Sequence, residues 1–144
     1  MSRRVHLDAN VILRFLRNDD PEQSAAAVVL FNRAEAGSLD LVVSPVTLME
    51  VFYVLATTYG MPRPEVAKIL HTFLTSDLVG CEDDGITIAA LQRITTNKVS
   101  FGDAYLAATA GHSQEELATF DKGITSLKDV RVYPLADAVK AKSR

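Results

Sequence analysis

The stretch Arg4-Val-His-Leu-Asp-Ala-Asn-Val-Ile-Leu-Arg-Phe-Leu16 decides the fold of this chain. Its first four residues have the composition of a short strand, the Asp8-Ala-Asn10 tripeptide forms a turn, and the apolar residues from Val11 onward recur at helical spacing. The stretch therefore predicts a strand, a turn and a helix in immediate succession. That order is typical of proteins in which helices connect the strands of a parallel sheet.

The remaining sequence continues this alternation. Further strands are predicted at 40–44, 77–81, 116–120 and 130–133, and helices at 21–35, 46–59, 65–75, 85–96 and 104–110. Right-handed crossovers between such strands give a parallel sheet that is covered by helices on both faces. We therefore expect an α/β protein with three α/β/α layers and a central parallel sheet. Ligands of such sheets bind beyond the carboxyl ends of the strands, where Asp8 follows the first strand and Asp121 the fourth.

Composition narrows the class of protein. The 144 residues are 48% hydrophobic and carry a formal net charge of −3, which predicts one folded domain over 1–144 with a solvated tail in the last few residues. No apolar run is long enough to cross a membrane, and no secretory signal is visible, so a cytoplasmic protein is expected. The single cysteine, Cys81, excludes an internal disulfide and a zinc site built of cysteines.

The acidic balance disfavours a broad nucleic-acid-binding surface, because affinity of that kind comes from many contacts between basic side chains and phosphates. It does not exclude a nuclease, since a site that holds divalent cations through carboxylates is negative until the metal binds.

Four acids stand out by their local context: Asp8, Glu50, Asp103 and Asp121. Glu50 interrupts the apolar helix predicted from residue 46 onward, and burying a carboxylate there is costly unless it is protonated, paired or bound to a metal. Asp103 lies in Ser-Phe-Gly-Asp at a predicted helix start, and Asp121 ends a predicted strand. If these segments converge, they offer the oxygen ligands that Mg²⁺ or Mn²⁺ prefers, and a metal-bound water can then cleave a phosphodiester without a side-chain nucleophile.

Each acid also has a structural interpretation. Asp8 can cap the helix that follows it, the Ser100-x-x-Asp103 spacing is close to a capping box, and Asp121 can be an ordinary turn residue. Only Glu50, inside a helix, has no capping role, so its position favours a functional role or a buried ion pair.

The chain resembles the PIN-domain family, and within it the VapC-like toxins. The resemblance rests on four motifs in order, namely Val-His-Leu-Asp-Ala-Asn at 5–10, Glu50 in an apolar helix after Ser-Pro, Phe-Gly-Asp-Ala at 101–104 and Thr-Phe-Asp-Lys at 119–122. It extends from Arg4 to about Leu135. It implies a small α/β/α ribonuclease that uses Mg²⁺ or Mn²⁺, acts on RNA as a homodimer, and is held inactive by a VapB-like antitoxin.

Residue by residue, the resemblance assigns Asp8, Glu50, Asp103 and Asp121 to the metal-binding, catalytic quartet. It implies that Asn10 fixes the amino-terminal turn and that Thr119 supplies a hydroxyl before the last acid. The sequence departs from the family at Gly123, where relatives often carry a further acid.

The implied antitoxin has a physical rationale. Four clustered carboxylates without metal repel one another, so an Arg from an antitoxin tail can enter the cleft and exclude substrate and cation together. Apolar residues of the early helices are expected to belong to the core, and they offer a dimer or antitoxin surface if they are exposed. These residues are Ala25, Val28, Val29 and Phe31.

Two other functions remain open from the sequence. A haloacid-dehalogenase-like phosphatase would use Asp8 as a covalent nucleophile, but it needs an acid where Asn10 stands and gives Glu50 no role. A non-catalytic interaction module of the same fold would use the four acids only as helix caps and turn residues.

Overall fold

A three-stranded parallel sheet organises the computed structural model, which describes residues 3–135. Strand β1 (Arg3–His6) pairs with β2 (Leu39–Val42), and β2 pairs with β3 (Val79–Gly80), in the order β1-β2-β3. Helices connect each strand to the next, as the sequence predicts. The described residues therefore form an α/β protein, consistent with a three-layer α/β/α fold.

The described chain contains seven helices. They are α1 (Ala9–Arg17), α2 (Pro21–Glu35), α3 (Pro45–Thr57), α4 (Arg63–Thr75), α5 (Ile86–Thr96), α6 (Phe101–His112) and α7 (Lys122–Thr125). None of them is long and apolar enough to cross a membrane. Local capping sets several boundaries: the Ser44 hydroxyl accepts a hydrogen bond from the N–H of Thr47, directly before Pro45 opens α3. Helix α6 starts at Phe101, three residues before the predicted start, because Ser100 is its N-cap.

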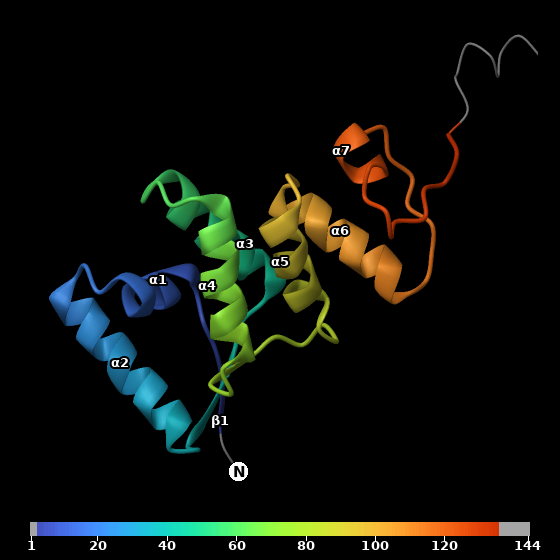
Figure 1. Cartoon of the computed structure of the whole chain (residues 1–144). Coiled ribbons are helices and arrows are strands. Elements are labelled where there is room, and N and C mark those ends of the chain that lie inside the picture. Colours follow the sequence, from blue (N-terminus) through green and yellow to red (C-terminus); the bar gives the residue numbers. More distant parts are fainter. Residues whose placement is uncertain (1–2, 136–144) are drawn as a thin grey trace, which may run out of the picture.

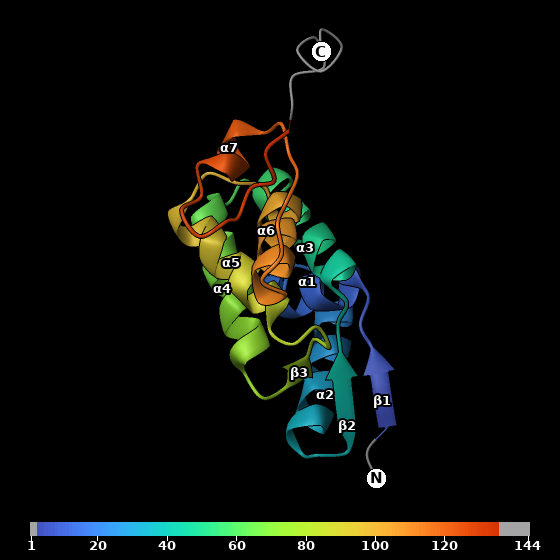
Figure 2. The same ribbon diagram turned by 90° about the vertical axis from the view of Figure 1, so that its right-hand side faces the viewer.

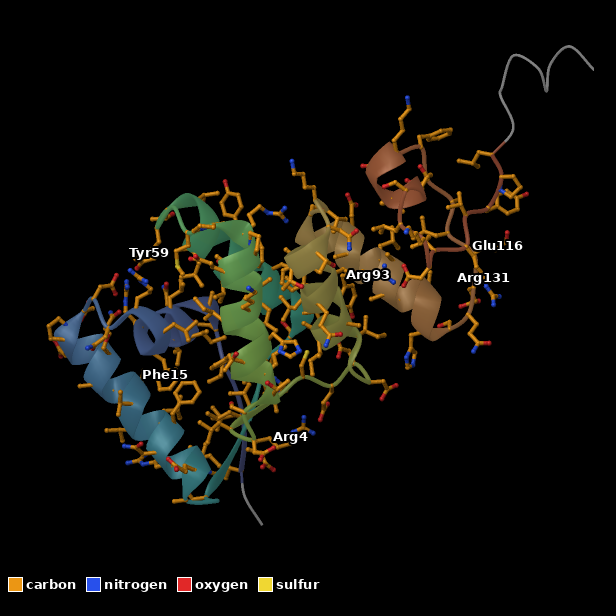
Figure 3. The ribbon with its side chains drawn as sticks, viewed as in Figure 1. Arg4, Phe15, Tyr59, Arg93, Glu116 and Arg131 are labelled. Atoms are coloured by element: carbon orange, nitrogen blue, oxygen red, sulfur yellow. The ribbon has the colours of Figure 1, made fainter. Side chains whose placement is uncertain are left out.

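Figure 1 shows α2 on one side of the strands and α5 and α6 on the other, and Figure 2, turned by 90°, shows α2 behind β2. Aromatic side chains join the helices on the α2 side. The ring of Phe15 (α1; labelled in Figure 3) stacks on that of Phe31 (α2) with centroids 3.9 Å apart. Phe73 of α4 meets Phe31 edge-on at 5.8 Å. One continuous core, which includes the fully buried Leu48 of α3 and Leu91 of α5, extends from the sheet to α6.

The two faces of the sheet differ in polarity. Leu39 and Leu41 of β2 are buried, whereas Arg4, His6 and Asp40 are exposed. Arg4 lies opposite Asp40 in the register of β1 and β2. Alternate residues of a strand point to opposite faces, so the described strands bury one face and leave polar side chains on the other.

The predicted strands at 116–120 and 130–133 are not part of the sheet. Within the described chain they form only an isolated parallel bridge, Leu117 to Val132, in which the Leu117 N–H donates to the Arg131 carbonyl at 2.8 Å. The segment 113–135 packs instead against α6, where Leu117, Ile124 and Leu127 form a small second cluster with Ala107. Both Figures 1 and 2 show α7 at the opposite end of the molecule from the start of β1.

Candidate active site

Asp8 lies at the carboxyl end of β1, where the sequence predicts it. Its Oδ1 accepts a hydrogen bond from the Val11 N–H at 3.1 Å, which makes Asp8 the N-cap of α1. The residue is exposed and, together with Asn10, lines a groove of about 330 Å³ between α1 and α2. Asp8 is thus both a helix cap and an accessible carboxylate.

Glu50 is exposed, so the expectation of a buried carboxylate that needs compensation is wrong. Residues 46, 50, 53 and 57 fall on one face of α3 because of their helical spacing. That face is turned toward solvent although it carries two large apolar side chains: Val46 is 75% exposed and Tyr53 is 67% exposed. An apolar sequence around an acid therefore does not establish that the acid is buried.

Asp103 occupies the first turn of α6 and is half-buried. Its backbone N–H donates to the Ser100 hydroxyl at 3.1 Å, so the capping interpretation holds for Ser100. The carboxylate of Asp103 lies in the first turn of α6, where an acidic residue stabilises the helix through its dipole.

Asp121 is exposed and caps the short helix α7, with its Oδ1 accepting from the Gly123 N–H at 2.7 Å. Thr119 supports the same turn, since its hydroxyl accepts a hydrogen bond from the Asp121 N–H at 3.0 Å. A Cβ at position 123 would lie 2.9 Å from the Asp121 Oδ1. A side chain at that position, where the family often has an acid, would therefore require the Asp121 carboxylate to shift from this cap geometry.

The four acids do not form a metal-binding cluster in this arrangement. Within residues 3–135, no three side chains of the His, Cys, Asp and Glu types are grouped so that they could hold a metal ion. Asp121 belongs to the segment packed on α6 and not to a strand of the sheet beside Asp8, which removes the basis on which the sequence places these two acids together. Carboxylates are suitable ligands for hard cations, and within the described residues these four do not come together in a group of three or more.

The perturbed titratable groups lie elsewhere and have structural causes. Burial raises the pKa of the Cys81 thiol, which disfavours the thiolate and agrees with a structural cysteine. The hydrogen bond from the Tyr59 hydroxyl lowers the pKa of Asp19, which also accepts from Arg14 (Figure 3). The hydrogen bonds among Arg14, Asp19 and Tyr59 connect the turn between α1 and α2 to the segment that follows α3.

The sequence does not reveal a cleft of about 770 Å³ where α3, α4, the end of α5 and the start of α6 meet. Its lining includes the exposed Tyr53, together with Arg63 and Lys98. No short motif marks these residues, because they come from three separate segments and are brought together only by helix packing.

The fold and the order of the acids together define a class of protein. It is an α/β protein with a parallel sheet and one acid after β1. Its further acids lie in α3, at the start of α6 and at the start of α7. The family model of the PIN domain matches residues 5–130, and the chain belongs to the PIN-domain family. PIN domains are generally metal-dependent nucleases, and the matched range contains all four acids. A search of curated proteins finds no match. The family membership does not favour the phosphatase alternative.

Proposed function

We propose that this protein is an endoribonuclease that depends on Mg²⁺ or Mn²⁺ and acts in the cytoplasm as the VapC-like toxin of a toxin–antitoxin pair. The observation that carries the proposal is the PIN-domain match over 5–130, which includes Asp8, Glu50, Asp103 and Asp121 in the order of the family motifs. Three of these acids are exposed and the fourth is half-buried, so all are accessible to solvent or a ligand.

The proposed catalytic residues are these same four acids, with Asn10 and Thr119 in supporting positions. This assignment is supported by the residue types of the four acids and by their order along the chain. It is not supported by the distances between them, because the described structure does not bring them together in one cluster. The Thr119 hydroxyl accepts a hydrogen bond from the backbone N–H of Asp121, which supports a role for Thr119 in holding the turn that carries the last acid.

An antitoxin surface is supported by the exposed face of α2. Val28 and Val29 are 43% and 49% exposed, and Ala25 is exposed beside them, whereas Phe31 is buried in the core. The groove between α1 and α2 that contains Asp8 and Asn10 adjoins this helix. We propose that a VapB-like antitoxin covers the α2 face and places an Arg side chain near Asp8. A homodimer is the proposed oligomeric state of the toxin, and sedimentation of the purified chain tests it.

The test of the nuclease function is cleavage of cellular RNA by the purified protein with Mn²⁺ or Mg²⁺, followed by sequencing of the new ends. We expect Asp8→Asn and Asp103→Asn to reduce cleavage on the order of 100-fold or more, and EDTA to abolish it. Asn caps helices about as well as Asp, so Asp8→Asn keeps α1, and Asp103→Asn leaves the Ser100 cap of α6 in place.

Asp20→Asn is the matched control, because Asp20 caps α2 through the Gln23 N–H at 3.1 Å in the same way as Asp8 caps α1. It should cleave like the parent protein. Glu50→Gln separates the alternatives, since it should cripple a nuclease and spare a phosphatase. Cleavage that persists in EDTA, or in both Asp8→Asn and Asp103→Asn, would refute the proposal.

A further inference from the structure

The cleft between α3, α4 and the α5–α6 connection has a fixed aromatic floor. The rings of Phe52 (α3) and Phe101 (α6) meet edge-on with centroids 5.4 Å apart. The guanidinium of Arg63 lies 5.4 Å above the Phe52 ring and donates to the Val99 carbonyl at 2.7 Å. These contacts join three segments of the chain, so the floor of the cleft is formed before any ligand binds.

The rim of the cleft is cationic and amphipathic. Arg63 and Lys98 line it, and no Asp or Glu does, although acidic residues outnumber basic ones in the chain as a whole. Tyr53 presents a largely exposed ring at the rim, and the Asn97 amide lies beside Lys98. A flat ring, an aromatic floor and two cations suit a ligand that combines a planar base with a phosphate.

The cleft adjoins two of the proposed catalytic acids. Glu50 and Tyr53 are three residues apart on the exposed face of α3, and neighbours at that spacing lie side by side on a helix. Ser100 lines the cleft and caps α6, whose first turn carries Asp103. A nucleotide in the cleft would therefore lie next to the segments that hold Glu50 and Asp103.

We propose that this cleft is a nucleotide-binding subsite for single-stranded RNA, in which a base stacks on Tyr53 while Arg63 and Lys98 bind the adjacent phosphate. The inference rests on the proposed ribonuclease function and names the part of the protein that holds the substrate strand. A second copy of the chain is the other candidate occupant of this face, and the experiment below distinguishes it by its effect on the oligomeric state.

The test is binding without cleavage. A fluorescein-labelled 12-nucleotide single-stranded RNA is titrated with the protein in EDTA, and fluorescence anisotropy reports the dissociation constant. Tyr53→Ala should weaken binding by about 5- to 100-fold, the range expected for the loss of one stacked base. Tyr53→Phe should bind nearly as well as the parent, because it keeps the ring. Tyr133→Ala is the matched control, since Tyr133 is likewise an exposed tyrosine and lies outside the cleft.

The salt dependence of binding tests the proposed phosphate contact separately. Lys98→Ala should weaken binding and lower the slope of log K against log salt by about 0.7, the value for one contact to a single strand. Lys128→Ala, an exposed lysine outside the cleft, should leave the slope unchanged. Tyr53 and Lys98 are exposed, so their replacement leaves the core intact and thermal unfolding should be unaffected.

The outcomes separate this inference from the proposed function. Cleavage in Mn²⁺ is measured in parallel on the same samples. If the parent protein binds and cleaves RNA but Tyr53→Ala and Lys98→Ala bind equally well, the subsite is refuted and the ribonuclease function stands. If Tyr53→Ala breaks a dimer in sedimentation and leaves RNA affinity unchanged, the cleft is a subunit interface and the inference is again refuted. If the parent neither binds nor cleaves RNA, both proposals fail.

Discussion

Residues 3–112 and residues 113–135 are held together in different ways. The first region buries side chains from the sheet and from α1 to α6 in one core. The second has one short helix and an isolated bridge, and it rests on α6 through Ala107, Leu117, Ile124 and Leu127. Three of the proposed catalytic acids therefore lie in the strongly packed region, whereas Asp121 lies in the weakly packed one.

The largest effect is expected from Leu48→Ala in the main core. Leu48 of α3 is fully buried, and its truncation removes buried apolar surface and leaves a cavity among rigid neighbours. The free energy of unfolding should fall by about 3–5 kcal/mol, measured by urea denaturation. Because the second region rests on α6, which belongs to this core, the loss should appear in both regions. A loss below about 1 kcal/mol would mean that α3 is not packed as described.

Ile124→Ala tests the second region and should have a smaller, more local effect. Ile124 is buried in the small cluster, which can collapse around a missing side chain more easily than the main core can. We expect about 2 kcal/mol, at the lower end of the range for such truncations. Hydrogen exchange should show faster exchange in 113–135 and unchanged protection in α3 and α5. Loss of protection throughout the chain would show that the two regions unfold as one unit.

The same contrast explains how much of the fold could be predicted from sequence. The helices and strands up to residue 112 carry local signals, such as Pro21 after the Asp20 cap and Pro45 after the Ser44 cap, and their order is confirmed. The strand predicted at 116–120 has no comparable local anchor. Its apolar residues are as compatible with a packed loop as with a strand. Which part of the protein this segment packs against depends on residues that are distant in the sequence.

The candidate site divides in a similar way. The position of Asp8 after β1 follows from its strand, and the start of α6 near Asp103 follows from Ser100, because both are encoded within a few residues. The exposure of Glu50 could not be predicted, since the hydrophobicity of α3 does not tell which of its faces meets solvent. The cleft with Tyr53 and Arg63 requires the packing of separate helices, so no sequence pattern indicates it.

The ion pair between Arg93 and Asp129 joins the two regions and should contribute moderately to the free energy of unfolding. Arg93 of α5 donates to both oxygens of the Asp129 carboxylate, at 2.8 and 2.6 Å (Figure 3). These hydrogen bonds lower the pKa of Asp129. A carboxylate whose pKa is lower in the folded state stabilises the fold above its unfolded pKa, and this contribution is lost as the pH falls through the folded pKa.

Asp129→Asn should therefore cost about 0.5–1 kcal/mol at neutral pH, a modest value because the carboxylate is largely exposed to solvent. The difference between the parent and the variant should shrink as the pH falls through the acidic range, because protonation removes the same charge from the parent. Thermal unfolding across pH 2–7 measures it. A difference that stays constant over this range would show that the charge of Asp129 does not stabilise the junction.

The smallest effect is expected from Gln114→Gly at the start of the second region. Gln114 has a φ of +57°, in the left-handed region, directly after the Ser113 that ends α6. Glycine adopts this conformation without the steric cost borne by other residues, but it also gives the unfolded chain more freedom. The balance should stabilise the protein by about 0.5 kcal/mol. Ser113→Gly is the matched control, since Ser113 has a φ of −85° and gains nothing from glycine, so that variant should be destabilised. If both substitutions lower the midpoint of urea denaturation equally, the turn at 114 does not hold the left-handed conformation, and the direction in which the chain leaves α6 is not fixed there.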